Sequence, residues 1–124
     1  MATVLGYFVF ENAGDGCLLG KYSNWRLHSP LTECTKLIRM NDLQPGFAGS
    51  YRSTWIEGNQ ISGGVGQATL RIAPKANSQG IFTLEWSVDA VFHGEGMLYK
   101  DLLIGAYWND EVHGPTIPLR PARN

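Results

Sequence analysis

Apolar residues recur at every second position along much of this chain. The segment 81–88 shows this most clearly, because from Phe82 onward its apolar residues are Phe82, Leu84, Trp86 and Val88, and the residues between them are polar. Successive side chains of a β-strand point to opposite faces, so a period of two predicts a strand with one buried face. We therefore predict a strand here that packs against a hydrophobic core.

The same alternation, interrupted by turn residues, predicts further strands. Fifteen glycines and six prolines divide the chain into short segments. The predicted strands are 3–10, 17–23, 35–40, 49–56, 67–73, 81–88, 91–98 and 102–108. In 49–56 we expect Tyr51, Ser53 and Trp55 to share a face, and in 67–73 we expect Ala68, Leu70 and Ile72 to point inward.

One of these strands has a rival interpretation. Leu31, Thr35 and Ile38 have roughly helical spacing, so a short helix is the alternative to the strand at 35–40. Elsewhere the connections are short, and a closed sheet leaves no unpaired edge. We predict an all-β fold, a single antiparallel up-and-down β-barrel of about eight strands. One domain spans 1–124, in which 110–124 loses the alternation and is expected to be an irregular strap or tail.

Gly94 and Gly96 interrupt the predicted strand at 91–98. Glycine inside a strand is locally unfavourable, so its repetition needs a cause. Strong coiling of a barrel strand would explain it, as would clearance for a bulky neighbour such as Trp86 or Trp108. A ligand that approaches the bare backbone is the functional alternative, and we favour the structural explanations.

Composition excludes several classes of protein. The net charge is -1, from 10 basic and 11 acidic residues, and no basic run predicts a nucleic-acid surface. No apolar run approaches the roughly 18 residues of a membrane helix, and the first residues do not resemble a secretory signal. We therefore expect a cytoplasmic protein, in which Cys17 and Cys34 are free thiols.

His93 and Glu95 are the first candidates for chemistry, because they lie two residues apart on one predicted strand face. An imidazole and a carboxylate in this arrangement can act as general acid and base, with Tyr107, if their face points into the barrel. Alternating His and Glu are also typical of a solvated sheet face. No third ligand is in place for a metal, because His28 and His113 lie in irregular segments, so we predict neither a metal nor a cofactor.

The aromatic residues suggest a binding site. Trp55, Trp86 and Trp108 lie near the ends of predicted strands, with Tyr51 and Tyr107 close to strand ends. Such side chains can line the mouth of a barrel cavity, where they give apolar walls with polar groups. Arg52 and Glu85 are candidates for the rim. The same aromatic residues can instead fill a core without a ligand.

Three segments, "GSYRSTWI", "FTLEWSV" and "FHGEGMLYKDLLIGAYW", resemble the strand pattern of small bacterial calycin-like or avidin-like barrels. In these, a strand carrying G-x-G-x-L turns tightly into a strand that ends in an aromatic residue. The resemblance covers Gly49 to Trp108. The segment "GDGCLLGKYS" is similar to their D-G-x-L-x-G-x-W pattern, with Tyr22 in place of tryptophan, and its early position implies a permuted strand order. The resemblance implies a barrel that often binds a small hydrophobic molecule, but it places no biotin-site residues.

Three function classes follow. We expect a β-barrel that binds a small hydrophobic or aromatic ligand, without nucleic-acid or membrane partners. The alternative is a cofactor-independent cyclase or isomerase that acts on a small organic substrate inside the barrel. A third class is a homo-oligomeric interaction module, for example a homodimer, without a ligand.

Overall fold

The structure is a computed structural model that describes residues 5–25, 27–43, 46–56, 65–87 and 91–109. These residues form eight strands and one short 3-10 helix. They are β1 (Leu5–Gly14), β2 (Cys17–Asn24), β3 (Leu31–Leu37), η1 (Met40–Asp42), β4 (Gly49–Ile56), β5 (Val65–Pro74), β6 (Ile81–Ser87), β7 (Val91–Tyr99) and β8 (Leu102–Asn109).

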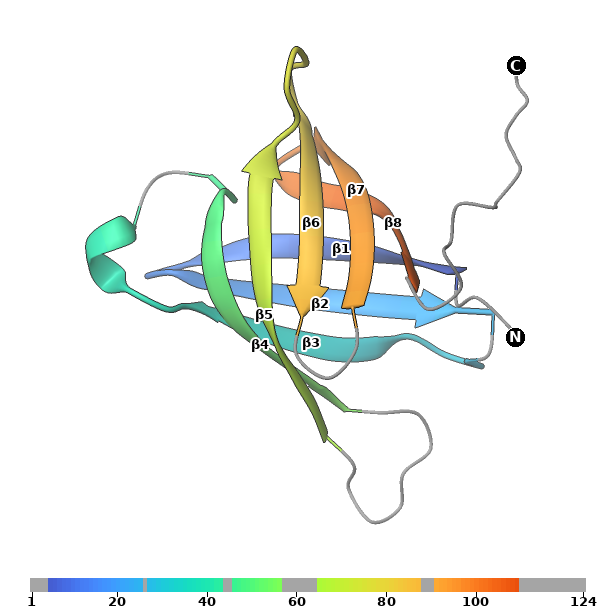
Figure 1. Ribbon diagram of the computed structural model, residues 1–124. Coiled ribbons are helices and arrows are strands. Elements are labelled where there is room, and N and C mark those ends of the chain that lie inside the picture. The colour runs from blue at the N-terminus through green and yellow to red at the C-terminus, as the bar shows by residue number, and fades with distance from the viewer. Residues whose placement is uncertain (1–4, 26, 44–45, 57–64, 88–90, 110–124) are drawn as a thin grey trace.

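The strands close into a single up-and-down barrel (Figure 1). Each strand pairs antiparallel with the next in sequence, and β8 pairs antiparallel with β1, from Leu5 opposite Trp108 to Glu11 opposite Leu102. The predicted fold class is therefore confirmed. Closure leaves no strand of the sheet with an open edge, and so it removes the template for edge-to-edge aggregation.

The strand at 35–40 was misplaced by the sequence prediction. β3 runs from Leu31 to Leu37, and the 3-10 turn η1 follows it. The helical alternative is wrong, because the backbone of Leu31–Leu37 pairs with β2 on one side and β4 on the other. The predicted tail at 110–124 lies outside the described residues, as does Val88.

The inward positions of the strands form the core. The predicted inward residues Ala68, Leu70 and Ile72 are buried, as are Leu84 and Trp86, which confirms the faces of β5 and β6. Side chains buried to 1% exposure or less include Phe10, Leu18, Leu70 and Leu103. Removing each such side chain from water contributes about 1.5–3 kcal/mol to folding.

The glycines of β7 make room for aromatic rings. Gly94 and Gly96 face inward and are buried. A Cβ on Gly94 would lie 3.0 Å from Cζ3 of Trp86, and one on Gly96 would lie 3.2 Å from Cζ of Phe8. Trp86 therefore limits the space at Gly94 together with the carbonyl oxygen of Ala106, whereas at Gly96 the space is limited by Leu103, Phe8 and the carbonyl oxygen of Ile104. A tight turn at Lys100–Asp101, with φ of 48° and 68°, then leads into β8.

The two ends of the barrel carry different connections. One end, which we call the Phe10 end, has the β1–β2, β3–β4, β5–β6 and β7–β8 connections. The other, which we call the Glu33 end, has the β2–β3, β4–β5 and β6–β7 connections.

The outer surface also has two different sides. Across β4, β5 and β6 it is polar, with Arg52, Arg71 and Glu85 exposed. Across β1 and β8 it is apolar: Leu5 lies opposite Trp108 and Tyr7 lies opposite Ala106, and Tyr7 is 63% exposed. Within the described residues, no helix is both long and apolar enough to cross a membrane.

Candidate functional site

A carboxylate lies buried inside the barrel at the Glu33 end. Leu31, Glu33, Thr35 and Leu37 alternate with the exposed residues Thr32, Cys34 and Lys36, so the inner face of β3 includes Glu33. Its side chain is only 5% exposed. Burying a carboxyl group is costly unless the protein provides hydrogen bonds or a partner charge, so this position needs an explanation.

Two donors reach Glu33, and both bind the same oxygen. The hydroxyl of Ser53 on the neighbouring strand β4 donates to Oε2, and Nε1 of Trp86 on β6 donates to Oε2 over 2.7 Å. The Trp86 bond crosses the lumen between strands that are not neighbours in the sheet. Among the residues that the structure describes, none forms a hydrogen bond or an ion pair with Oε1.

Burial controls the protonation of this group. Desolvation raises the pKa of Glu33 above its ordinary value, and the hydrogen bonds from Ser53 and Trp86 partly oppose this effect because they favour the charged form. Oε2 already accepts two hydrogen bonds, so a bound proton is most favourable on Oε1. The carboxyl group thus has one oxygen that accepts two hydrogen bonds from the protein and one oxygen that accepts none from the described residues.

Tyr107 is the centre of an aromatic cluster beside this carboxyl group. Its ring makes edge contacts with Trp86, Phe92 and Tyr22, with centroid separations of 6.0, 5.9 and 6.4 Å. Nδ2 of Asn24 donates to the Tyr107 hydroxyl over 2.9 Å. Burial raises the pKa of Tyr107, and the negative charge of Glu33 raises it further, while the Asn24 bond lowers it. Trp86 links the two acidic groups, because its Nε1 donates to Glu33 and its ring contacts that of Tyr107.

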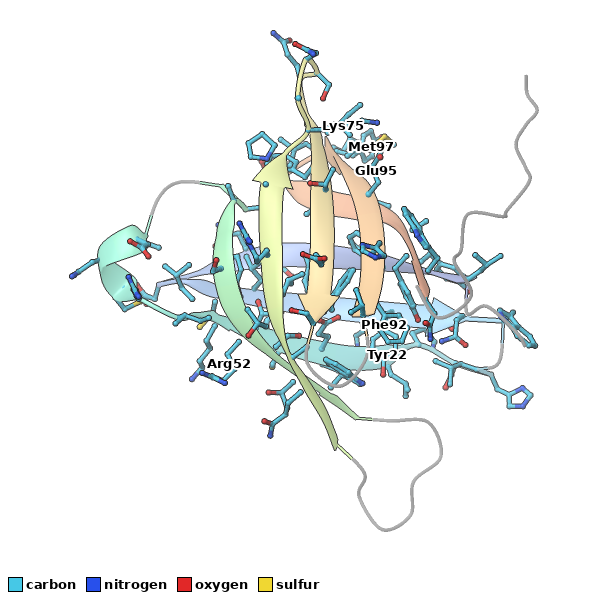
Figure 2. The ribbon with its side chains drawn as sticks, viewed as in Figure 1. Tyr22, Arg52, Lys75, Phe92, Glu95 and Met97 are labelled. Atoms are coloured by element: carbon cyan, nitrogen blue, oxygen red, sulfur yellow. The ribbon has the colours of Figure 1, made fainter. Side chains whose placement is uncertain are left out.

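Solvent reaches part of this cluster. Tyr22, Trp55 and Phe92 belong to the inward faces of their strands and pack against the core, but each is only partly buried. Figure 2 shows Tyr22 and Phe92 at the end of the barrel where β6 ends and β7 begins. The Glu33 end thus combines partly exposed aromatic rings with buried polar groups, a composition typical of small-molecule sites.

The sequence-predicted site residues fall into three groups. Trp55, Trp86 and Tyr107 come together on the inner face at the Glu33 end. Tyr51 is also buried and inward, but it lies toward the Phe10 end, where its hydroxyl donates to the carbonyl of Phe47 over 2.8 Å. The remaining residues belong to the outer face: Arg52, Glu85, His93, Glu95 and Trp108.

His93 and Glu95 do not meet the condition for their predicted acid–base role, which was that their strand face points into the barrel. Both alternate with the inward glycines of β7, so they lie on the outside of the barrel. Glu95 pairs with Lys75 over 3.2 Å, and both side chains are more than 40% exposed. The His93 ring lies 6.3 Å from that of Trp108. Acid–base catalysis by this pair required that both side chains point into the barrel. Glu33 and Tyr107 point into it instead.

Sequence reasoning did not single out Glu33, Ser53, Asn24 or Tyr22 as site residues. The signal for Glu33 was the alternation of Leu31, Glu33, Thr35 and Leu37, which begins four residues before the predicted strand. Because the two middle residues of that inner face are polar, the pattern does not stand out as hydrophobic. Ser53 was placed on the correct face, between Tyr51 and Trp55.

A hollow lies at the opposite end of the barrel, the Phe10 end. It is a half-open cleft of about 350 Å³, lined partly by Asn12, Leu18, Leu37, Leu43 and Tyr51. Asn12 closes one side through a 3.0 Å bond from Nδ2 to the carbonyl of Gly46. Its walls are aliphatic side chains, glycine backbone and surface polar groups. No buried carboxyl group faces this cleft within the described residues, so we place the candidate site at the Glu33 end, where the buried polar groups converge.

The residues that the structure describes offer few other groups for metal binding or catalysis. It contains no group of three or more His, Cys, Asp or Glu side chains that could hold a metal ion. Cys17 and Cys34 are both free, and Cys34 is exposed. Comparisons with protein-family models, with curated proteins and with solved structures found no match for this chain.

Proposed function

We propose that this protein binds a small aromatic or apolar molecule inside the Glu33 end of its barrel. The observation that carries the proposal is the solvent-accessible aromatic cluster around a buried carboxyl group with one oxygen unused. A resemblance to ligand-binding calycin-like or avidin-like barrels supports the same proposal. In this arrangement Tyr22, Trp55 and Phe92 form the walls, and Glu33, Asn24 and Tyr107 supply the polar contacts.

Tryptophan fluorescence tests this proposal, because Trp55 and Trp86 lie at the site. The protein is purified under mild conditions and examined by native mass spectrometry, and fluorescence is recorded during titration with small aromatic probes. We expect saturable quenching that weakens at least about tenfold in Phe92→Ala, because a wall of the site is lost. Thr83→Ala, an exposed change on the outer face of β6, serves as the matched control. Equal quenching in both variants would contradict the proposal.

The pair of acidic groups also supports a cofactor-independent isomerase as a second candidate. Glu33 as carboxylate would accept a proton from the carbon next to a substrate carbonyl, and the Tyr107 hydroxyl would hydrogen-bond the enolate oxygen that forms. Return of a proton from Glu33 to a different carbon completes an isomerisation without any oxidant. Incubation with acetophenone in D₂O should then incorporate deuterium into its methyl group, and Glu33→Gln should abolish this. Equal exchange with and without protein would exclude this chemistry for that ketone.

Self-association is a third candidate, and the apolar outer side of β1 and β8 favours it. Leu5, Tyr7 and Trp108 form a flat apolar surface, while the opposite side of the barrel is polar. Two such sheet faces can pack against each other at about 10 Å. Light scattering over a concentration series should show a dimer that Tyr7→Glu dissociates, whereas Arg71→Glu on the polar side leaves it intact. A monomer at every concentration would contradict this candidate.

A further inference from the structure

The unused oxygen of Glu33 restricts the chemistry of the ligand. Its two protein donors, Ser53 and Trp86, are neutral, and both bind Oε2. Every lysine and arginine side chain that the structure describes is exposed at the surface. The lumen therefore contains an acidic group for which the described part of the chain provides no partner cation. A buried carboxylate is stable only when its charge is compensated and its lone pairs are bonded.

The aromatic rings at the Glu33 end also favour a positively charged ligand. Trp86 donates to Glu33 and its ring contacts that of Tyr107, which in turn contacts the rings of Tyr22 and Phe92. The face of an aromatic ring carries partial negative charge, so it attracts a cation, and tryptophan and tyrosine do so most strongly. A carboxylate and aromatic faces together would repel an anionic ligand. A neutral ligand would gain no ion pair and would leave Glu33 in its neutral form, whereas a cation can pair with the carboxylate.

We propose that the ligand of this site is an organic cation, a protonated amine with an aromatic or apolar body, whose N–H donates to Oε1 of Glu33. The ammonium group would replace the missing partner charge, and the body would lie against Tyr22, Trp55 and Phe92. This inference rests on the proposed binding function, and it names the class of ligand.

Proton linkage gives the proposal a second signature. Burial raises the pKa of Glu33, so the empty site favours the neutral acid, whereas the cation requires the carboxylate. Affinity for a ligand that stays charged should then increase with pH until Glu33 is ionised in the empty protein. Tyr22 and Tyr107 are the other titratable groups that face the site within the described residues, and burial raises the pKa of Tyr107 above its ordinary value. The outer groups His93 and Glu95 do not face it.

Three probes of one shape test the inference. Benzylamine, benzyl alcohol and benzoate are titrated into the full-length protein at about pH 8, where the amine is protonated, and binding is followed by tryptophan fluorescence and calorimetry. We expect benzylamine to bind at least about tenfold more tightly than benzyl alcohol, and benzoate to bind most weakly. We also expect benzylamine affinity to fall as the pH is lowered toward about 5.

Two variants separate the role of Glu33 from general effects. Glu33→Gln should remove the advantage of benzylamine and its pH dependence, while the affinity for benzyl alcohol stays within about twofold. Glu85→Gln changes an exposed carboxylate on the outer face of β6 and should alter nothing. Circular dichroism and the unfolding midpoint establish that each variant is folded.

The possible failures are distinguishable. If benzyl alcohol and benzylamine bind equally, the binding function stands and the cation inference is overturned. If Glu33→Gln retains the preference for the amine, the charge that selects it is elsewhere, which also overturns the inference. If none of the three probes binds, even at millimolar concentration, both the binding site and the inference are overturned.

Discussion

The two ends of the lumen share one backbone pattern but differ in what their inner faces carry. At the Phe10 end, Phe10, Leu18 and Leu103 are at most 1% exposed and interlock as an apolar plug. At the Glu33 end, the inward positions of β2 and β8 are instead occupied by Asn24 and Tyr107, and the neighbouring strand β3 contributes Glu33. The strands continue from one end to the other without a break, so the difference lies in side chains alone. The Phe10 end can supply packing stability, because the barrel does not need buried apolar side chains at both ends.

The largest expected effect comes from breaking the plug. Phe10→Ala removes a fully buried ring at the Phe10 end, and we expect the free energy of unfolding to fall by about 3–5 kcal/mol. Urea unfolding followed by circular dichroism measures this. Phe92→Ala, at the partly exposed Glu33 end, should cost clearly less. Equal losses for the two changes would show that the Glu33 end is packed as tightly as the plug.

Adding a methyl group at each end sharpens the comparison. A Cβ on Gly20 would lie 2.6 Å from the Phe10 ring, and one on Gly6 would lie 2.5 Å from the Tyr107 ring. Both Gly20→Ala and Gly6→Ala should destabilise the protein by about 1–3 kcal/mol through overpacking. Gly6→Ala alone should also shift the absorbance titration of tyrosine, because it displaces Tyr107 from Asn24. If Gly20→Ala shifted the absorbance titration of tyrosine as much as Gly6→Ala does, a packing change at the Phe10 end would alter the surroundings of Tyr107 at the Glu33 end.

Glu33 should make stability depend on pH. Its folded pKa is raised, so the folded protein binds more protons than the unfolded chain between the unfolded pKa and the folded pKa. The contribution of this group is therefore greatest below the unfolded value, about 4.3, and is lost as the pH rises through the folded value, with a slope of up to about 1.4 kcal/mol per pH unit. Unfolding curves of the wild type and Glu33→Gln over this range measure the difference. If the free energy of unfolding changed with pH in the same way in both proteins, the raised pKa of Glu33 would be contradicted.

The smallest effect is expected on the outer face. Glu95→Gln breaks the exposed pair with Lys75 and should change the free energy of unfolding by no more than about 0.5 kcal/mol. Probe binding should be unchanged, because Glu95 lies outside the lumen. If Glu95→Gln weakened probe binding as much as Glu33→Gln does, the binding site would lie on the outer face of the sheet, and its placement in the lumen would be wrong.

The sequence predicted the barrel well because most of its strands have hydrophobic inner faces. The predicted bounds of β4, 49–56, agree with the structure, and Trp86 and Tyr107 were placed among the candidates for the cavity wall. Two failures had physical causes. The inner face of β3 carries Glu33 and Thr35, so its hydrophobic alternation was weak and the strand was placed too late. The inner face of β7 carries Gly94 and Gly96, which have no side chains to mark it as inward, so the side of His93 and Glu95 could not be assigned.

The pairing of β1 with β8 has a consequence for how the chain is made. β1 is synthesised before β8, and its second edge stays uncovered until β8 is made, because seven residues of β1, from Leu5 to Glu11, take their partners from β8. Until then the nascent sheet remains an open ribbon, able to pair with other chains. Contacts between such distant strands also slow folding. We therefore expect closure of the β1–β8 pair to be the slow step of folding.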